Sequence, residues 1–493
     1  MQSKKYIEDH YSLYINGKWT DGSSGKRLNS YNPANGEKLA DFIDATNEDV
    51  SNAAKAAREA LKSWRKVSIV ERSKILLKIA DVIDENIEHL AYVETLDNGK
   101  PIRETLKHDL PLCADHFRYF AGLIRGEEGS AQAFDDYSLS FVLKEPIGVV
   151  GQIVPWNFPF LMAAWKLAPA LAMGNTVVIH PSSSTSLSIL EFAKLLDPIL
   201  PAGVVNVITG KGSKSGDYML NHEGFDKLAF TGSTEVGYNV ALAAAKRLIP
   251  ATLELGGKSA NIIFDDAPWE KAISGVQLGI LFNQGQVCCA GSRVFVQEGI
   301  YDDFVKDLGK AFENIKVDLP WKPETQMGAQ INEKQVSDIL EYVEIGKQEG
   351  AKLLTGGYRL VDNNLDKGCF IAPTLFIDVT NDMRIAREEI FGPVAVVIKF
   401  KTIDEVINLA NDSEYGLGGG VWTSSLDTAL KVSRNLETGR VWVNSYNQIP
   451  AGAPFGGYKK SGIGRETYKS MLEAYSQTKN IYIDTNPEKN TFY

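Results

Sequence analysis

Two adjacent cysteines lie in the stretch Phe282-Asn283-Gln284-Gly285-Gln286-Val287-Cys288-Cys289-Ala290-Gly291-Ser292-Arg293, a bend rich in glycine and side-chain amides rather than a periodic apolar face. Upstream, a glutamate stands beside two glycines in Leu253-Glu254-Leu255-Gly256-Gly257-Lys258. A thiol and a carboxylate, each held in a glycine-rich segment, suit nucleophilic attack followed by general-base hydrolysis. The alternative interpretation is a buried structural cysteine and a solvated glutamate, because free cysteines are among the most buried residue types.

Length and composition bound the class of protein. A chain of 493 residues predicts two or three domains. The hydrophobic content of 44% and the charged content of 23% are ordinary for a soluble globular protein. The formal net charge of -10, with lysines and arginines scattered along the chain, argues against a nucleic-acid partner.

The N-terminus and the apolar segments indicate a cytoplasmic protein. No apolar run follows the lysines of residues 1–10, so these residues do not form a secretory signal. No stretch approaches the roughly 18 uninterrupted apolar residues of a transmembrane helix, so no membrane partner is expected.

The cysteine and histidine patterns indicate neither a disulfide framework nor a metal site. The four cysteines are Cys113, Cys288, Cys289 and Cys369, and adjacent cysteines are poor disulfide partners. None of the six histidines has metal-ligand spacing with another histidine or a cysteine. We therefore predict chemistry without a metal.

Strands alternating with helices predict a parallel, doubly wound sheet between Ile147 and Gly237. A second round begins at Ala260 and extends to about Asn447. Closer to the N-terminus, Thr46 with Asp49 predicts the start of a packing helix. The expected strands of the first round are 148–154, 175–179, 204–208 and 227–230.

Five blocks, in a fixed order along nearly the whole chain, resemble the aldehyde dehydrogenase family. They are Pro155-Trp156-Asn157-Phe158-Pro159, Phe230-Thr231-Gly232-Ser233-Thr234-Glu235-Val236-Gly237, the cysteine stretch, Glu388-Glu389-Ile390-Phe391-Gly392-Pro393 and Pro454-Phe455-Gly456-Gly457-Tyr458-Lys459-Lys460-Ser461-Gly462. The end of the chain, 464–467 through 477–480, is most similar to bacterial acetaldehyde and short-chain aliphatic aldehyde dehydrogenases.

The resemblance implies an α/β fold of two doubly wound, Rossmann-like domains with a small β oligomerisation element. We expect a dinucleotide-binding domain over 1–127 and 147–256, a catalytic domain over 257–458, and the oligomerisation element over 128–146 and 470–493. An exposed apolar edge strand invites pairing with another chain, so a homotetramer or a homodimer is expected.

The resemblance also assigns the chemistry, with Cys288 as nucleophile and Cys289 as a packing residue. Attack on an aldehyde gives a thiohemiacetal whose oxyanion accepts hydrogen bonds from the Asn157 amide and the Cys288 backbone N–H, and one such donor contributes about 3 kcal/mol. Hydride passes to NAD(P), and a water activated by Glu254 hydrolyses the remaining thioester to the carboxylic acid.

A cofactor site is predicted where a strand ends and the helix 236–246 begins. The free N–H groups of a helix N-terminus suit a pyrophosphate beside Gly232 and Ser233. A simple Gly/Ser turn is the alternative, because the three-glycine dinucleotide fingerprint is absent.

Four further cofactor residues follow from the resemblance. Glu389 matches the residue that holds the nicotinamide ribose, and Phe391 would pack near the ring. Trp156 lies in the first matching block. Lys166 would orient the cofactor or relay protons, with an ordinary surface lysine as the alternative.

The sequence departs from the family pattern at His180 and Ser183, where NAD-preferring members carry a lysine and a glutamate. The serine removes a carboxylate that repels a 2′-phosphate, whereas loss of the lysine removes a cation that would bind it. Histidine is mostly neutral near pH 7 unless a phosphate raises its pKa. The expected cofactor is NAD, with NADP tolerated or favoured.

An apolar substrate tunnel is also implied by the resemblance. An aromatic and aliphatic wall would admit small uncharged aldehydes, and no arginine stands at the matched positions to bind a terminal carboxylate. Betaine aldehyde remains an alternative substrate, because aromatic walls also bind quaternary ammonium groups. The matched positions are Phe158, Met162, Trp165, Phe282, Ile449 and Phe455.

Two alternative functions stay open. In a CoA-acylating dehydrogenase CoA takes the acyl group from Cys288, but members of that kind typically lack the glutamate present here as Glu254. A non-catalytic binding protein on the same scaffold would be expected to lose Cys288, Glu254 or Asn157, and all three are present.

Overall fold

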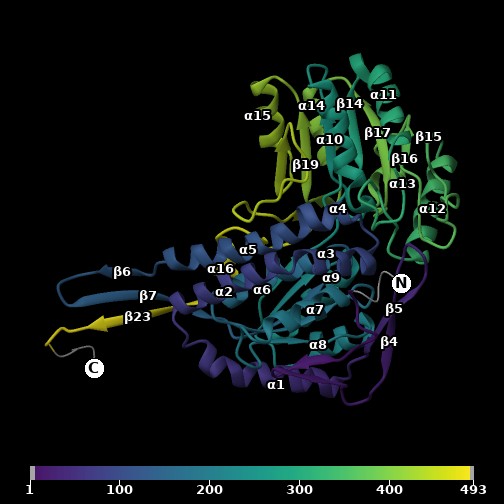
Figure 1. The fold of residues 1–493 in the computed structure, drawn as a ribbon. Coiled ribbons are helices and arrows are strands. Elements are labelled where there is room, and N and C mark those ends of the chain that lie inside the picture. The colour runs from purple at the N-terminus through teal and green to yellow at the C-terminus, as the bar shows by residue number, and fades with distance from the viewer. Residues whose placement is uncertain (1–5, 489–493) are drawn as a thin grey trace.

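Two mainly parallel β-sheets organise the computed structural model, which describes residues 6–488 (Figure 1). Each sheet is covered by helices, and a long antiparallel ribbon projects from one side of the molecule. The α/β class expected from the alternating pattern is thereby confirmed. The first residues of the predicted dinucleotide-binding domain (1–5) and the last of the predicted oligomerisation element (489–493) lie outside the described residues.

The first sheet has a parallel centre and antiparallel edges. Its strand order is β22-β12-β11-β8-β9-β10-β2-β3, and neighbours from β12 to β10 run parallel. The bounds are β2 Leu13–Ile15, β3 Lys18–Thr20, β8 Val149–Val154, β9 Thr176–Pro181, β10 Val205–Val207, β11 Lys227–Thr231, β12 Ala251–Glu254 and β22 Gly462–Ile463.

Strand alternation explains why helices cover both faces of this sheet. Along β9, Val177 and Ile179 belong to one apolar cluster and Val178 to another. A strand with apolar residues on both sides must be covered on both faces. The helices that pack against the sheet or against its covering helices are α1 Asn47–Trp64, α2 Ile69–Glu85, α3 Ile87–Asn98, α5 Leu110–Leu123, α6 Pro159–Ala172, α7 Leu187–Leu196, α8 Asp217–Asn221 and α9 Thr234–Arg247.

Local signals set two of these helix starts, and the one at Thr46 is the start that the sequence predicts. Thr46 and Asp49 form a capping box at the start of α1, with each side chain bonded to the other residue's backbone N–H. Ser68 caps α2 by accepting a hydrogen bond from the Glu71 N–H.

The second sheet has the order β15-β16-β17-β14-β13-β19-β20 and is parallel except at β15. Its strands are β13 Ala260–Ile263, β14 Arg293–Gln297, β15 Lys352–Thr355, β16 Thr374–Ile377, β17 Val394–Phe400, β19 Gly418–Trp422 and β20 Arg440–Val443. The accompanying helices are α10 Trp269–Leu281, α11 Tyr301–Glu313, α12 Glu333–Gln348, α13 Arg384–Arg387, α14 Ile403–Asn411 and α15 Leu426–Asn435.

The projecting ribbon joins two segments that are far apart in sequence. Strand β7 (Ser138–Pro146) pairs with β6 (Ser130–Ala133) and, over nine residues, with β23 (Ser476–Asp484). β23 forms one edge of this sheet, and its Tyr482 is exposed. The role of the ribbon in oligomerisation stays a prediction, and so do the predicted domain boundaries.

The remaining strands and α-helices are short. They are β1 His10–Tyr11, β4 Arg27–Tyr31, β5 Lys38–Ile43, α4 Ile102–Glu104, β18 Tyr415–Gly416, β21 Tyr458–Lys459 and α16 Ser470–Ala474. Among residues 6–488, no helix is both long and apolar enough to pass through a membrane.

Candidate active site

A cavity of about 290 Å³ lies at the ends of three neighbouring parallel strands. Because β8, β11 and β12 run in the same direction, the residues at and after their carboxyl ends meet at one edge of the sheet. These residues include Asn157, Ser233 and Glu254, and all three line the cavity. The cysteine segment closes it from the side of the second sheet.

The backbone of the cysteine segment is held in an unusual shape. Asn283 and Gln284 have φ of 48° and 57°, values that non-glycine residues adopt rarely. Gly285 follows with φ of 75°, and a Cβ there would lie 2.1 Å from the Gly392 carbonyl oxygen. The glycine therefore allows the tight turn in the segment that carries Cys288.

Cys288 and Cys289 both line the cavity; Cys288 is half-buried, whereas Cys289 is buried. The interaction with the Cys289 thiol, burial, and the carboxylates of Glu389 and Glu254 together raise the pKa of Cys288 well above its usual value. The Cys289 Sγ lies 3.6 Å from the Asn447 side-chain oxygen. A thiol with a raised pKa needs a base to accept its proton before it can attack.

Glu254 ends β12 inside the cavity and is almost fully buried. Neither carboxylate oxygen accepts a hydrogen bond from the described part of the chain. Burial, together with the charge of Glu466, raises the pKa of Glu254 well above its usual range. A buried carboxylate without a partner costs folding free energy, and such groups cluster at functional sites.

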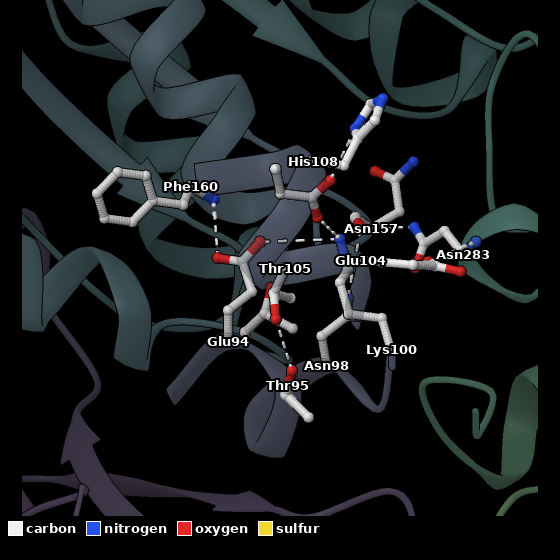
Figure 2. Close-up of polar contacts among 12 residues, drawn as sticks. Glu94, Thr95, Asn98, Lys100, Glu104, Thr105, His108, Asn157, Phe160 and Asn283 are labelled. Carbon is white, nitrogen blue, oxygen red and sulfur yellow. Dashed lines mark hydrogen bonds and ion pairs between the residues drawn. The ribbon is translucent and has the colours of Figure 1, made fainter. Parts of the chain in front are cut away.

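Asn157 is fixed between the two sheets by a buried network of amides, part of which is shown in Figure 2. Its side-chain Nδ2 donates to the backbone carbonyl oxygen of Gln286 at 2.9 Å. The backbone carbonyl oxygen of Asn157 accepts from Asn283 Nδ2 at 2.7 Å. The backbone N–H of Asn283 in turn donates to Glu104 at 3.0 Å. One amide hydrogen of Asn157 is left for a further acceptor.

The loop between β11 and α9 also lines the cavity through Gly232 and Ser233. Helix α9 begins at Thr234, two residues earlier than predicted, because Ser233 Oγ caps it by accepting from the Val236 N–H at 3.3 Å. The Ser233 hydroxyl hydrogen remains able to donate. The start of this helix therefore lies at the cavity edge, where its free N–H groups suit an anion.

Glu389 and Phe391 form the opposite side of this cavity edge. The Glu389 carboxylate accepts from the Gly257 N–H at 2.9 Å, and burial raises its pKa to about 7. A Cβ at Gly256 would lie 2.3 Å from that carboxylate, so a larger residue there would displace the Glu389 side chain. The Phe391 ring packs edge-on against Trp156 at 5.3 Å.

Three predicted cofactor residues do not line the cavity. Lys166 is fully buried behind it in an ion pair with Glu466, so the surface-lysine alternative is wrong. His180 is also buried, and its Nε2 lies 2.7 Å from Ser215 Oγ. Burial lowers the pKa of His180 to about 4, so the ring is neutral near pH 7. Ser183 is half-buried outside the cavity lining.

All six predicted tunnel residues line the cavity, from Phe158 to Phe455. Leu161 lines it too, and its spacing from Phe158, Met162 and Trp165 is the i, i+3, i+4, i+7 pattern of one helix face, a signal that could have revealed it. The other lining residues absent from the predicted site are His108, Pro155, Thr231, Leu255, Gly256, Val287, Cys289, Gln335 and Asn447.

Within residues 6–488, no group of three or more histidine, cysteine, aspartate or glutamate side chains is arranged to hold a metal ion. The four cysteines are free thiols. Chemistry without a metal stays a prediction.

The fold and the site define the class of this protein. It is an α/β protein built on two Rossmann-like sheets, with a thiol, a carboxylate and an amide around one cavity. Residues 19–481 match the model of the aldehyde dehydrogenase family. A Vibrio cholerae serotype O1 protein described as an aldehyde dehydrogenase is 50% identical over 488 residues, which are 98% of this chain and 96% of that protein. This chain therefore belongs to the aldehyde dehydrogenase family, whose members are NAD(P)-dependent oxidoreductases.

Solved structures show the same likeness. The NAD+ complex of an aldehyde dehydrogenase from Bacillus cereus is 43% identical, with a TM-score of 0.96 over 98% of this chain and 99% of that one. A betaine aldehyde dehydrogenase from Staphylococcus aureus in complex with NAD+ is 40% identical, with a TM-score of 0.97 over 100% of this chain and 98% of that one.

Proposed function

We propose that this protein oxidises small uncharged aliphatic aldehydes to carboxylic acids, with Cys288 as nucleophile, Asn157 as oxyanion donor and Glu254 as general base. The observation that carries the proposal is that these three side chains line one cavity. Family membership supports the reaction class.

In the first step the Cys288 sulfur bonds to the aldehyde carbon, and the thiol proton leaves to a base. The negative charge that develops on the aldehyde oxygen is stabilised by the remaining Asn157 amide hydrogen and the Cys288 backbone N–H. Removing one such donor typically costs about 3 kcal/mol of transition-state stabilisation. The product of this step is a thiohemiacetal on Cys288.

NAD, with NADP tolerated or favoured, is the proposed cofactor, and when bound it accepts hydride from the thiohemiacetal carbon. Observations on this chain fit such a group: the α9 start with Ser233 suits its phosphates, and the buried Glu389 suits a ribose hydroxyl. The NAD+ complexes of the two relatives support the assignment. We keep His180 and Ser183 as candidates for setting the NAD-to-NADP ratio, with the neutral His180 adding no positive charge.

Glu254 completes the cycle by accepting a proton from the water that attacks the thioester carbon, which releases the acid and restores the thiol. Its enclosed, unpartnered carboxylate supports hydrolysis over transfer of the acyl group to CoA. The CoA-acylating alternative predicts an acyl-CoA product when CoA is added.

The apolar wall supports small uncharged substrates. Phe158 and Phe282 lie with ring centroids 6.0 Å apart, and Trp165 packs edge-on against Phe455 at 5.2 Å. These aromatic faces also suit a quaternary ammonium group. The similarity to a betaine aldehyde dehydrogenase keeps betaine aldehyde as the alternative substrate.

We propose further that the predicted domain ranges hold and that the ribbon of β6, β7 and β23 joins copies of the chain into a homodimer or homotetramer. The exposed apolar residues of its edge strand, Ile481, Tyr482 and Ile483, support this assignment.

The test is the initial rate of NAD(P)H formation with acetaldehyde, a medium-chain aldehyde, betaine aldehyde and succinic semialdehyde, each with NAD and with NADP. Fast reduction with the uncharged aldehydes and none with the semialdehyde is expected. Absence of reduction with every aldehyde, in protein whose Cys288 still alkylates, would contradict the proposal.

A further inference from the structure

His108 places an imidazole in the apolar wall of the cavity. Its ring packs edge-on against Phe282, with centroids 5.0 Å apart, and Phe282 in turn packs against Phe158. The side chain is 32% exposed, yet its Nδ1 atom is buried. The accessible edge of the ring is therefore the Nε2 side.

A buried ion pair lies against the other edge of this ring. His108 Nδ1 lies 3.5 Å from one carboxylate oxygen of Asp109, whose second oxygen lies 2.7 Å from Lys100 Nζ (Figure 2). Glu94 lies 3.7 Å from the same Lys100 Nζ, and all three charged side chains are fully buried. Burial alone would raise the pKa of Asp109, but Lys100 and His108 outweigh it and hold the pKa below its usual value, so Asp109 is an anion.

An anion beside Nδ1 favours the tautomer with its proton on Nδ1, which leaves Nε2 as a hydrogen-bond acceptor. Lys100 also lies 4.1 Å from the centroid of the Phe158 ring. The same buried lysine thus contacts both the tunnel wall and the carboxylate that lies beside the histidine. The imidazole contacts the Asp109 carboxylate at its Nδ1 edge and the Phe282 ring.

We propose that His108 is a specificity-determining residue that selects aldehydes carrying a hydroxyl group. This inference rests on the proposed function and narrows its substrate class from small uncharged aldehydes to small hydroxyaldehydes. A substrate hydroxyl would donate to Nε2, while the aromatic neighbours cover its methylene groups. A hydroxyl suits this position in either imidazole protonation state, because it both donates and accepts.

The test compares kcat/KM within two near-isosteric pairs: glycolaldehyde against propanal, and 3-hydroxypropanal against butanal. A net hydrogen bond predicts a preference for the hydroxyl member on the order of tenfold in at least one pair. Comparing this ratio between variants cancels the intrinsic reactivity of the aldehydes.

Three substitutions at one position separate the hydrogen bond from shape. His108→Phe keeps an aromatic ring without an acceptor and should lower the ratio about tenfold, chiefly through KM for the hydroxyaldehyde. His108→Gln places a polar group near the Nε2 position and should keep most of the preference, whereas the shorter His108→Asn should lose it. His10→Phe, at an exposed histidine remote from the cavity, is the matched control.

An unchanged ratio in His108→Phe, or no hydroxyl preference in the wild-type protein, would overturn this inference while leaving the proposed function intact. Absence of NAD(P)H formation with all four aldehydes would overturn the proposed function and this inference with it.

Discussion

Glu254 and Asp109 are both carboxylates enclosed by protein, but of the two only Asp109 forms an ion pair within residues 6–488. Lys100 lies 2.7 Å from Asp109, and the pKa of Asp109 is held below its usual value. Glu254 has no hydrogen-bond partner among the described residues, and burial raises its pKa. The comparison distinguishes a structural carboxylate, which is paired with a cation, from a carboxylate available for proton transfer, which is unpaired. The distinction is informative because an unpaired buried charge destabilises the fold.

The largest effect is expected from removal of the nucleophile Cys288, which lines the same cavity as Glu254. Cys288→Ala should abolish dehydrogenase activity and leave NAD binding intact, because the thiol makes the only proposed covalent bond to substrate. Steady-state NADH formation and isothermal titration with NAD measure the two properties. Cys113→Ala, at a buried thiol outside the cavity, is the control, and an active Cys288→Ala enzyme would overturn the assignment.

Removing the charge of the unpaired carboxylate is expected to have the next largest effect. Glu254→Gln should lower turnover by about 10²–10⁴-fold, the usual contribution of a general base. The rapid burst of NADH should persist, because hydride transfer precedes hydrolysis. Stopped-flow absorbance resolves the two phases, and equal loss of burst and turnover would count against this role.

Breaking the buried ion-paired cluster of Lys100, Glu94 and Asp109 should affect the stability of the fold instead of the reaction. Lys100→Met leaves Glu94 and Asp109 buried without their cation, which should cost about 3–5 kcal/mol in the free energy of unfolding. The control is Lys62→Met, which removes an exposed pair with Glu59 and should leave stability nearly unchanged. Denaturant unfolding measures both, and an equally small change in the two variants would show that burial does not distinguish the pairs.

The pH dependence of hydrolysis is the smallest expected effect. A raised pKa keeps Glu254 protonated to higher pH, and only its carboxylate form can accept a proton from water. The single-turnover rate of deacylation should therefore rise with pH, by up to about tenfold per pH unit below the folded-state pKa. Glu254→Gln should lack this rise, and a pH-independent rate in the wild-type protein would argue against Glu254 as the base.

Much of the fold could be read from the sequence because its signals are local. Thr46 and Asp49 set a helix start through contacts three residues apart, and the strand pattern of residues 148–231 fixes a parallel sheet. Asn157 and Cys288 could be placed by their matching blocks, and Glu254 by the two glycines that follow it at 256 and 257. Their convergence on one cavity follows from parallel strands ending at the same edge.

The remaining site features depend on packing that sequence order does not reveal. Lys166 is paired with Glu466, 300 positions away, so no local pattern shows that it is buried. His108 lies in a π-helical turn, Thr105–Asp109, where an extra residue shifts the phase of the 3.6-residue pattern. This shift hides which side chains of the segment face the cavity.

The most direct test of the account is mass spectrometry of Glu254→Gln protein mixed with acetaldehyde and NAD. Slow hydrolysis should let the acyl enzyme accumulate, so we predict an acetyl thioester on the peptide that contains Cys288, assigned to Cys288 by fragmentation. Acetylation of Cys289, or an unmodified Cys288 in protein that has produced a full burst of NADH, would contradict it.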